Sequence, residues 1–151
     1  MGVFQLALLG VLAMLLIAAS VSDWRTRTIS NGLNTAIALG ALVWWWAIGL
    51  PLWPGVGWQL LLALVTFAVF AGLFALGAMG GGDVKLVAAL ALWFSLPLFV
   101  PLLMVMAIAG GVLTLALLIA HRARRAEGRP EIPYGIAISL GGLWAIFRTI
   151  S

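Results

Sequence analysis

The apolar residues of this chain fall into long blocks, and its few charged residues stand between those blocks. A helix that crosses a bilayer needs roughly 20 mostly apolar residues, and about 17 to 25 are tolerated. Residues 1–22 carry no charged side chain and predict one such helix. The uncharged stretch 28–82 is too long for one helix. We expect two helices there, separated near Pro51, Pro54 and the adjoining glycines, because prolines and glycines end helices.

The second half of the chain continues this pattern. The uncharged stretch 86–120 leaves room for two short spans that turn around Pro97 and Pro101. Residues 133–150 supply a sixth span. The pattern therefore predicts an all-α integral membrane protein with six transmembrane helices, and it predicts a single transmembrane domain over residues 1–151.

Composition agrees with a membrane protein and excludes several other classes. Hydrophobic residues make up 65% of the chain and charged residues 8%, against about 25% charged residues in soluble domains. The net charge of +4 does not indicate nucleic acid, because the basic residues stand in short clusters between uncharged stretches. The sequence has no cysteine and only one histidine, His121, so disulfides and thiolate chemistry are excluded. We expect neither a metal nor a cofactor.

The basic residues orient the predicted helices, because Arg and Lys in short loops are retained on the cytoplasmic side. Seven of the eight fall in the loops after the first, third and fifth helices: Arg25, Arg27, Lys85, Arg122, Arg124, Arg125 and Arg129. We therefore expect these loops in the cytoplasm and the N-terminus outside. A belt of tryptophans near the predicted outer helix ends agrees with this orientation: Trp44, Trp45, Trp46, Trp53, Trp58 and Trp93.

Only four carboxylates occur, and two of them are candidates for chemistry. Asp23 and Asp83 stand at helix–loop junctions on the predicted cytoplasmic side. Ionisable groups at membrane depth are costly and, where retained, usually face a cavity or one another. Glu127 and Glu131 alternate with arginines in a loop that we expect to be wet, and we do not select them.

Both aspartates also have a purely structural interpretation. Asp23 can pair with Arg25 or Arg27. Asp83 can cap the fourth helix beside Lys85. The charge pattern alone does not decide between these contacts and a catalytic pair.

A run of glycines precedes Asp83 in residues 79–86, MGGGDVKL. Because glycine has no Cβ, another backbone can come close to this loop, and an extended substrate strand can lie against it. A flexible turn between helices is the simpler interpretation of the same glycines.

Three motifs together resemble the type IV prepilin peptidases, which are GxGD intramembrane aspartic peptidases. Gly80, Gly82 and Asp83 match the GxGD signature. Residues 22–31 (SDWRTRTISN) resemble the family's other aspartate motif, in which Ile-Pro-Asn opens the next helix. Residues 132–138 (IPYGIAI) resemble the segment that opens the last helix in the short members linked to tight-adherence (Flp-type) pili.

The resemblance implies an aspartic endopeptidase that cleaves the leader from prepilin-like substrates at the cytoplasmic boundary of the bacterial inner membrane. Asp23 and Asp83 are then the catalytic residues, and the prepilin-like protein and the lipid bilayer are the partners. Ser30 stands where the family usually has proline, and we expect this replacement to loosen the loop that follows Asp23. Larger members carry a cysteine-containing insertion associated with N-methylation. This chain lacks it, so we expect no methyltransferase activity.

Two carboxylates that share a site cannot readily both ionise, which leaves one to accept a proton and one to donate it. Asp83 opens a predicted helix and is the predicted base, and Asp23 closes one and is the predicted acid. Arg25, Arg27 and Lys85 can reverse this assignment. Lys85 itself either positions the aspartates or substrate or anchors its loop in the cytoplasm.

Asn31 has two interpretations, a cap on the second helix or a support for the first aspartate loop, and we expect the cap. Two other functions of the whole chain stay open. A small proton-coupled transporter would place acids at mid-membrane, whereas both aspartates fall beside basic loops. A non-enzymatic membrane assembly protein of the same fold would need neither aspartate.

Overall fold

The computed structural model describes residues 1–123 and 132–151, and within them it has six α-helices and no strand. The helices are α1 (Val3–Thr26), α2 (Asn31–Ala47), α3 (Gly57–Ala75), α4 (Gly81–Ala91), α5 (Leu96–Ala123) and α6 (Tyr134–Ile150). A short π-helical turn, η1 (Leu52–Val56), leads into α3. The all-α prediction is confirmed for the described residues. The loop residues Arg124, Arg125, Glu127, Arg129 and Glu131 lie outside them.

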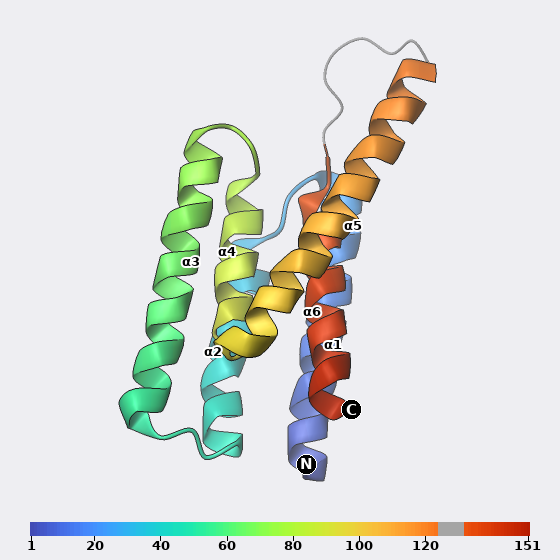
Figure 1. Cartoon of the computed structure of the whole chain (residues 1–151). Helices are drawn as coiled ribbons and strands as arrows, with labels where there is room; N and C mark the ends of the chain where they lie inside the picture. The colour runs from blue at the N-terminus through green and yellow to red at the C-terminus, as the bar shows by residue number, and fades with distance from the viewer. Residues whose placement is uncertain (124–131) are drawn as a thin grey trace.

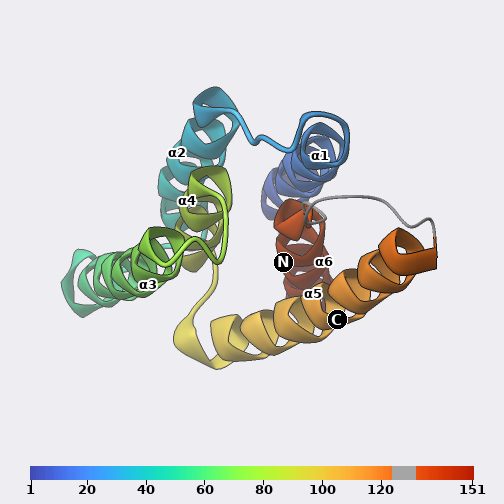
Figure 2. The ribbon, with the colours of Figure 1, turned by 90° about the horizontal axis from the view of Figure 1, so that it is seen from above.

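The helices run up and down, so alternate connections fall at the same end of the bundle. Figure 1 shows the α1–α2 and α3–α4 connections at one end, which we call the loop end, together with the end of α5 and the start of α6. Both chain termini lie toward the other end. Figure 2 shows α4 and α6 between the remaining helices, and α6 packs against α1, α4 and α5.

Three segments are long and apolar enough to cross a membrane: α1, the unit Leu52–Ala75 and α5. Much of their apolar surface is uncovered by protein, as at Leu64, Ile108 and Val112, which are 65%, 67% and 64% exposed. Surfaces of this kind require lipid rather than water. The helices α2 and α6 have 17 residues each, at the lower limit for a span, and α4 has 11 and is shorter.

The predicted turn around Pro97 and Pro101 is wrong. The chain turns earlier, between the end of α4 at Ala91 and the start of α5 at Leu96, and both prolines lie inside α5. Proline is tolerated in the first turn of a helix because the N–H that it lacks would have no helical partner there. Pro97 therefore begins a helix rather than ending one, and Pro101 follows one turn later.

The early end of α4 is stabilised by side chains from two other helices. The Gln59 amide of α3 donates to Ala91 O at 2.6 Å and to Phe94 O at 2.7 Å. The Trp45 indole of α2 donates to Leu92 O at 2.7 Å. Eleven residues rise about 16 Å, roughly half the hydrocarbon core, where an unpaired carbonyl costs several kcal/mol. These donors allow α4 to stop there.

Replacing Gln59 with Leu tests this account. The carbonyls of Ala91 and Phe94 lose their donor, so we expect the free energy of unfolding to fall by about 2 kcal/mol or more. The measurement is an SDS titration in mixed micelles. Trp58→Leu is the control, because Trp58 is the neighbouring residue and is 66% exposed. Equal destabilisation by both changes would contradict a specific role for the amide.

The predicted tryptophan belt is wrong for three of its six residues and stays a prediction for the other three. Trp46, Trp53 and Trp58 are exposed. Trp44, Trp45 and Trp93 are instead buried in the core and do not belong to a belt. Their rings pack between helices, and the Trp93 indole donates to Ile37 O at 2.8 Å. A buried indole needs an acceptor, and here backbone carbonyls supply it.

The middle of α6 packs closely against α1 and α5. An added Cβ on Gly141 would lie 2.8 Å from Leu102 O, and one on Gly142 would lie 2.7 Å from Leu16 Cδ1. Small residues of this kind let membrane helices approach closely. The position of α6 against α1 and α5 thus depends on these two glycines.

Candidate active site

Asp23 lies in the last turn of α1, and its side chain is buried. Its Oδ2 accepts a hydrogen bond of 2.8 Å from the Gly135 N–H in the first turn of α6. The first N–H groups of a helix have no partner within the helix, so they are available to an acid. The final helix thereby orients the first aspartate.

Gly135 is a site residue that sequence reasoning did not select. An added Cβ would lie 2.8 Å from Asp23 Oδ2 and 2.8 Å from Ile29 Cδ1, so no larger residue fits without displacing one of them. The available signal was the glycine two residues after Pro133, within a motif that was read only as the opening of the last helix.

Asp83 lies in the first turn of α4 and is buried. Its Oδ2 accepts a 3.2 Å hydrogen bond from the Gly80 N–H, so the expectation that Asp83 caps α4 is correct for one oxygen. Its Oδ1 is buried and has no hydrogen-bond partner among the described residues. Buried polar atoms are nearly always paired, so this oxygen is available to hydrogen-bond a molecule that enters the site.

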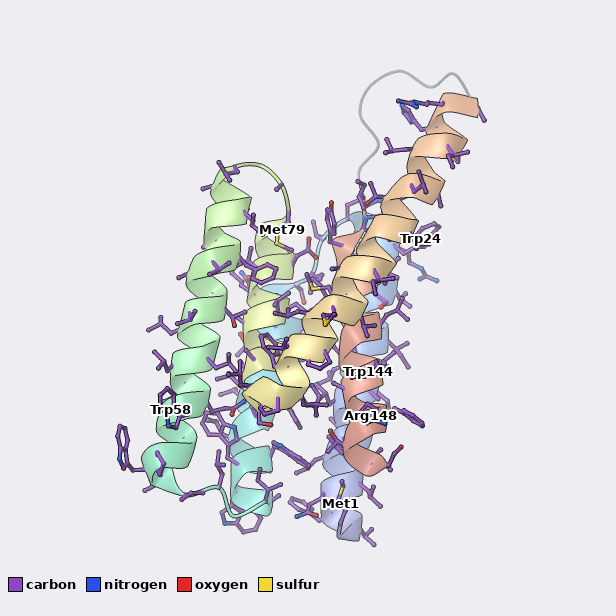
Figure 3. The ribbon with its side chains drawn as sticks, viewed as in Figure 1. Met1, Trp24, Trp58, Met79, Trp144 and Arg148 are labelled. Carbon is purple, nitrogen blue, oxygen red and sulfur yellow. The ribbon has the colours of Figure 1, made fainter. Side chains whose placement is uncertain are left out.

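The structure brings the two aspartates to one cavity. The cavity has a volume of about 570 Å³ and lies at the loop end, where Figure 3 labels Trp24 and Met79. Its lining comes from α1, the α1–α2 and α3–α4 connections, α4 and the start of α6: Asp23, Thr26, Arg27, Thr28, Gly77, Ala78, Met79, Gly80, Asp83, Ile132 and Tyr134. Two buried acids on one cavity suit proton transfer to and from a bound molecule.

A backbone does lie close to the glycine run, as predicted, at Gly82. It is the backbone of Ile29 in the same chain rather than that of a substrate. An added Cβ would lie 3.1 Å from Ile29 O and 3.3 Å from Ile29 N. The buried Asn34 amide donates to Gly82 O at 3.1 Å. The α1–α2 connection and α2 therefore hold the start of α4, which carries Asp83 and which we call the Asp83 loop together with the glycines before it. Asn34 was not selected from sequence, because no local pattern distinguishes it.

The prediction that Asn31 caps α2 is wrong, because Ser30 is the cap. The Ser30 hydroxyl accepts the Leu33 N–H at 3.2 Å, as expected of serine before a helix. Ser30 has a φ of −65°, the value that a proline ring would impose. Asn31 Oδ1 instead accepts from Lys85 Nζ at 2.7 Å. Lys85 does not line the cavity of the aspartates.

Ser30→Ala removes this cap, and we expect it to lower the free energy of unfolding by about 1 kcal/mol. The matched variant Ser30→Asn retains an acceptor and should stay close to wild type. Both values come from the same unfolding titration in micelles. A loss of equal size in Ser30→Asn would show that the hydroxyl does not act as a cap.

The two arginines of the first motif differ in position. Arg27 lines the cavity, adopts a left-handed φ of 54° after α1, and lies 5.5 Å from the centroid of the Trp24 ring. Arg25 is exposed and does not line the cavity. The dipole argument does not separate the roles of the aspartates, because Asp23 ends α1 but also accepts an N–H at the start of α6. Which aspartate is the base stays a prediction.

The fold and the site together define a multi-pass helical membrane protein with two buried carboxylates on one cavity. Within residues 1–123 and 132–151 no group of three or more His, Asp, Glu or Cys side chains could hold a metal ion. The model of the type IV leader peptidase family matches residues 10–115, which include both aspartates. The chain belongs to this family.

Membership confirms the resemblance drawn from the motifs, and it makes the chain a leader peptidase-like protease. The matched range stops before the motif at 132–138. No curated protein and no solved structure matches the chain.

Proposed function

We propose that the chain is an aspartic endopeptidase that removes the leader from prepilin-like membrane proteins. The observation that carries the proposal is that Asp23 and Asp83 line one cavity in a member of a leader peptidase family. The unpaired Oδ1 of Asp83 adds support, because it offers an acceptor to a water molecule in that cavity.

The two carboxylates supply the acid and the base for hydrolysis of the peptide bond. One carboxylate accepts a proton while the water oxygen attacks the carbonyl carbon, and its protonated partner donates to the carbonyl oxygen. When the tetrahedral intermediate collapses, the C–N bond breaks and the carboxylic acid that took the water proton passes it to the leaving nitrogen. A hydroxyl of the intermediate returns a proton to the other carboxylate as the C=O bond re-forms. Gly80 and Gly82 shape the Asp83 loop, and Gly135 orients Asp23.

We further propose that residues 1–151 form a single domain whose six helices lie in the inner membrane of a bacterium, with the N-terminus outside and α4 entering only partway. The loop end, with Arg25, Arg27 and Lys85, then faces the cytoplasm, while Arg148 lies toward the opposite end (Figure 3). A substrate with a cytoplasmic basic leader and an apolar helix presents its scissile bond at this level. The motif at 132–138 supports the tight-adherence pilus type, and the absence of cysteine from the sequence supports cleavage without N-methylation.

The test is cleavage of candidate prepilins by the purified protein in lipid nanodiscs, followed by mass spectrometry of both products. We expect cleavage at one bond, with no methyl group added when S-adenosylmethionine is supplied. An established prepilin peptidase serves as the positive control for each substrate. Substrates that this control cleaves and the folded protein leaves intact would contradict the peptidase proposal. A methylated product would contradict the restriction to cleavage.

A further inference from the structure

A second cavity lies on the other side of the Asp83 loop, between α2, α3 and α4, which are neighbours in Figure 2. It has a volume of about 450 Å³, and we call it the α2–α4 groove. Its lining residues are Asn31, Asn34, Thr35, Ala38, Ala63, Phe67, Lys85, Ala88, Ala89 and Leu92. None of them lines the cavity of the aspartates, so the groove is a separate feature.

The groove is polar at the loop end and apolar further along. Lys85 and Asn31 lie in the first turns of α4 and α2, and they are joined by the 2.7 Å hydrogen bond. Asn34 and Thr35 of α2 add two more polar side chains, and the rest of the walls consists of alanines and two larger apolar side chains, Phe67 and Leu92. One cationic end and a long apolar remainder match the two parts of a membrane lipid.

Asn34 supplies a second, independent observation. Its side chain lines the groove and is 4% exposed, and its amide nitrogen donates a hydrogen bond to Gly82 O. Its Oδ1 has no hydrogen-bond partner within the part of the chain that the structure describes. A buried acceptor of this kind is available to a donor that the described residues do not supply, such as a water molecule or a ligand hydroxyl.

We propose that the α2–α4 groove binds one anionic phospholipid, with its headgroup at Lys85 and Asn31 and an acyl chain along Ala38, Ala63 and Ala88. The assignment rests on the proposed position of the loop end at the membrane boundary. A free phosphate would leave the apolar walls uncovered, whereas an acyl chain covers them. A hydroxyl-bearing headgroup such as phosphoglycerol also carries the donor that the Asn34 oxygen lacks.

The bound lipid lies directly behind the Asp83 loop. Lys85 is two residues from Asp83, and Asn34 contacts both the groove and the backbone of Gly82. The headgroup is thus next to the same side chain that holds the loop in place. This proximity gives Lys85 a role in the protein without requiring that it touch the substrate.

Native mass spectrometry of the full chain in detergent, titrated with phosphatidylglycerol or phosphatidylcholine, tests the proposal. We expect the first lipid to bind about fivefold more tightly, and Lys85→Gln to abolish that preference, because one basic side chain contributes roughly this factor. Arg25→Gln is the matched control, since Arg25 is an exposed basic residue at the same end and outside the groove. Equal affinity for both lipids, or an equal loss in Arg25→Gln, would overturn the proposal.

A second pair of variants tests the acyl chain. Ala63→Phe fills the apolar part of the groove and should weaken the binding of both lipids. Ala68→Phe, on the same helix but outside the groove, should leave the binding of both unchanged. Glycerol phosphate, which has no acyl chain, should not compete. Competition by it would indicate a simple anion site instead. The assay reads binding alone, so its failure leaves the peptidase proposal standing, and absence of cleavage leaves the lipid site standing.

Discussion

We expect leader removal to fall by about 10³-fold or more when either Asp23 or Asp83 is replaced by Asn. An amide can neither take up the proton of the attacking water nor exist as the protonated acid, and general acid–base catalysis contributes about 10² to 10⁴-fold. The amide oxygen can still accept from Gly135 N–H or Gly80 N–H, so we expect the fold to be preserved. Cleavage rates of a prepilin in nanodiscs measure the effect.

Two further measurements separate loss of catalysis from loss of the fold and test whether the two aspartates act together. The double variant should be no slower than the slower single variant, because residues that act as a unit are not additive. The unfolding titrations of all three variants should lie close to wild type. Processing that persists in either single variant would reject the two-aspartate mechanism.

Gly135→Ala should lower the cleavage rate by about 10²-fold although both aspartates remain. The new methyl group would lie 2.8 Å from Asp23 Oδ2, so the carboxylate or the start of α6 must shift. Displacement of a catalytic group by about 1 Å can cost this much in rate. The measurement is the same nanodisc assay, with the rate taken at saturating substrate.

Gly10→Ala is the control for this prediction. Gly10 lies within α1, the helix that carries Asp23, and an added Cβ there meets nothing within 4 Å. We expect wild-type cleavage from it. Similar rates in Gly10→Ala and Gly135→Ala would show that α6 does not orient Asp23.

Local signals were sufficient for the first half of the fold and for the two aspartates. The charges after residue 22 and the prolines near residue 51 separate α1, α2 and α3, because each signal acts on its own segment of chain. The motif around Asp83 likewise depends on adjacent glycines. That both acids reach one cavity followed from the expectation that alternate loops share an end of the bundle.

The boundary between α4 and α5 could not be read in the same way. Two prolines there suggested a turn, yet the turn lies earlier because Gln59 and Trp45, more than 30 residues away, pair with the carbonyls of that segment. Gly135 and Asn34 were missed for the same reason. Each is defined by a partner that is distant in sequence, and although the motif at 132–138 contains Gly135, no local pattern identifies that partner.

The contact between Gly135 and Asp23 has a consequence for attempts to shorten this protein. The family match ends at residue 115, and a truncated chain of that length would still contain both acids. It would lack the N–H donor that fixes one of them. Under the proposed mechanism the smallest working unit therefore extends to α6, and we expect a split version to need that helix supplied as a second polypeptide.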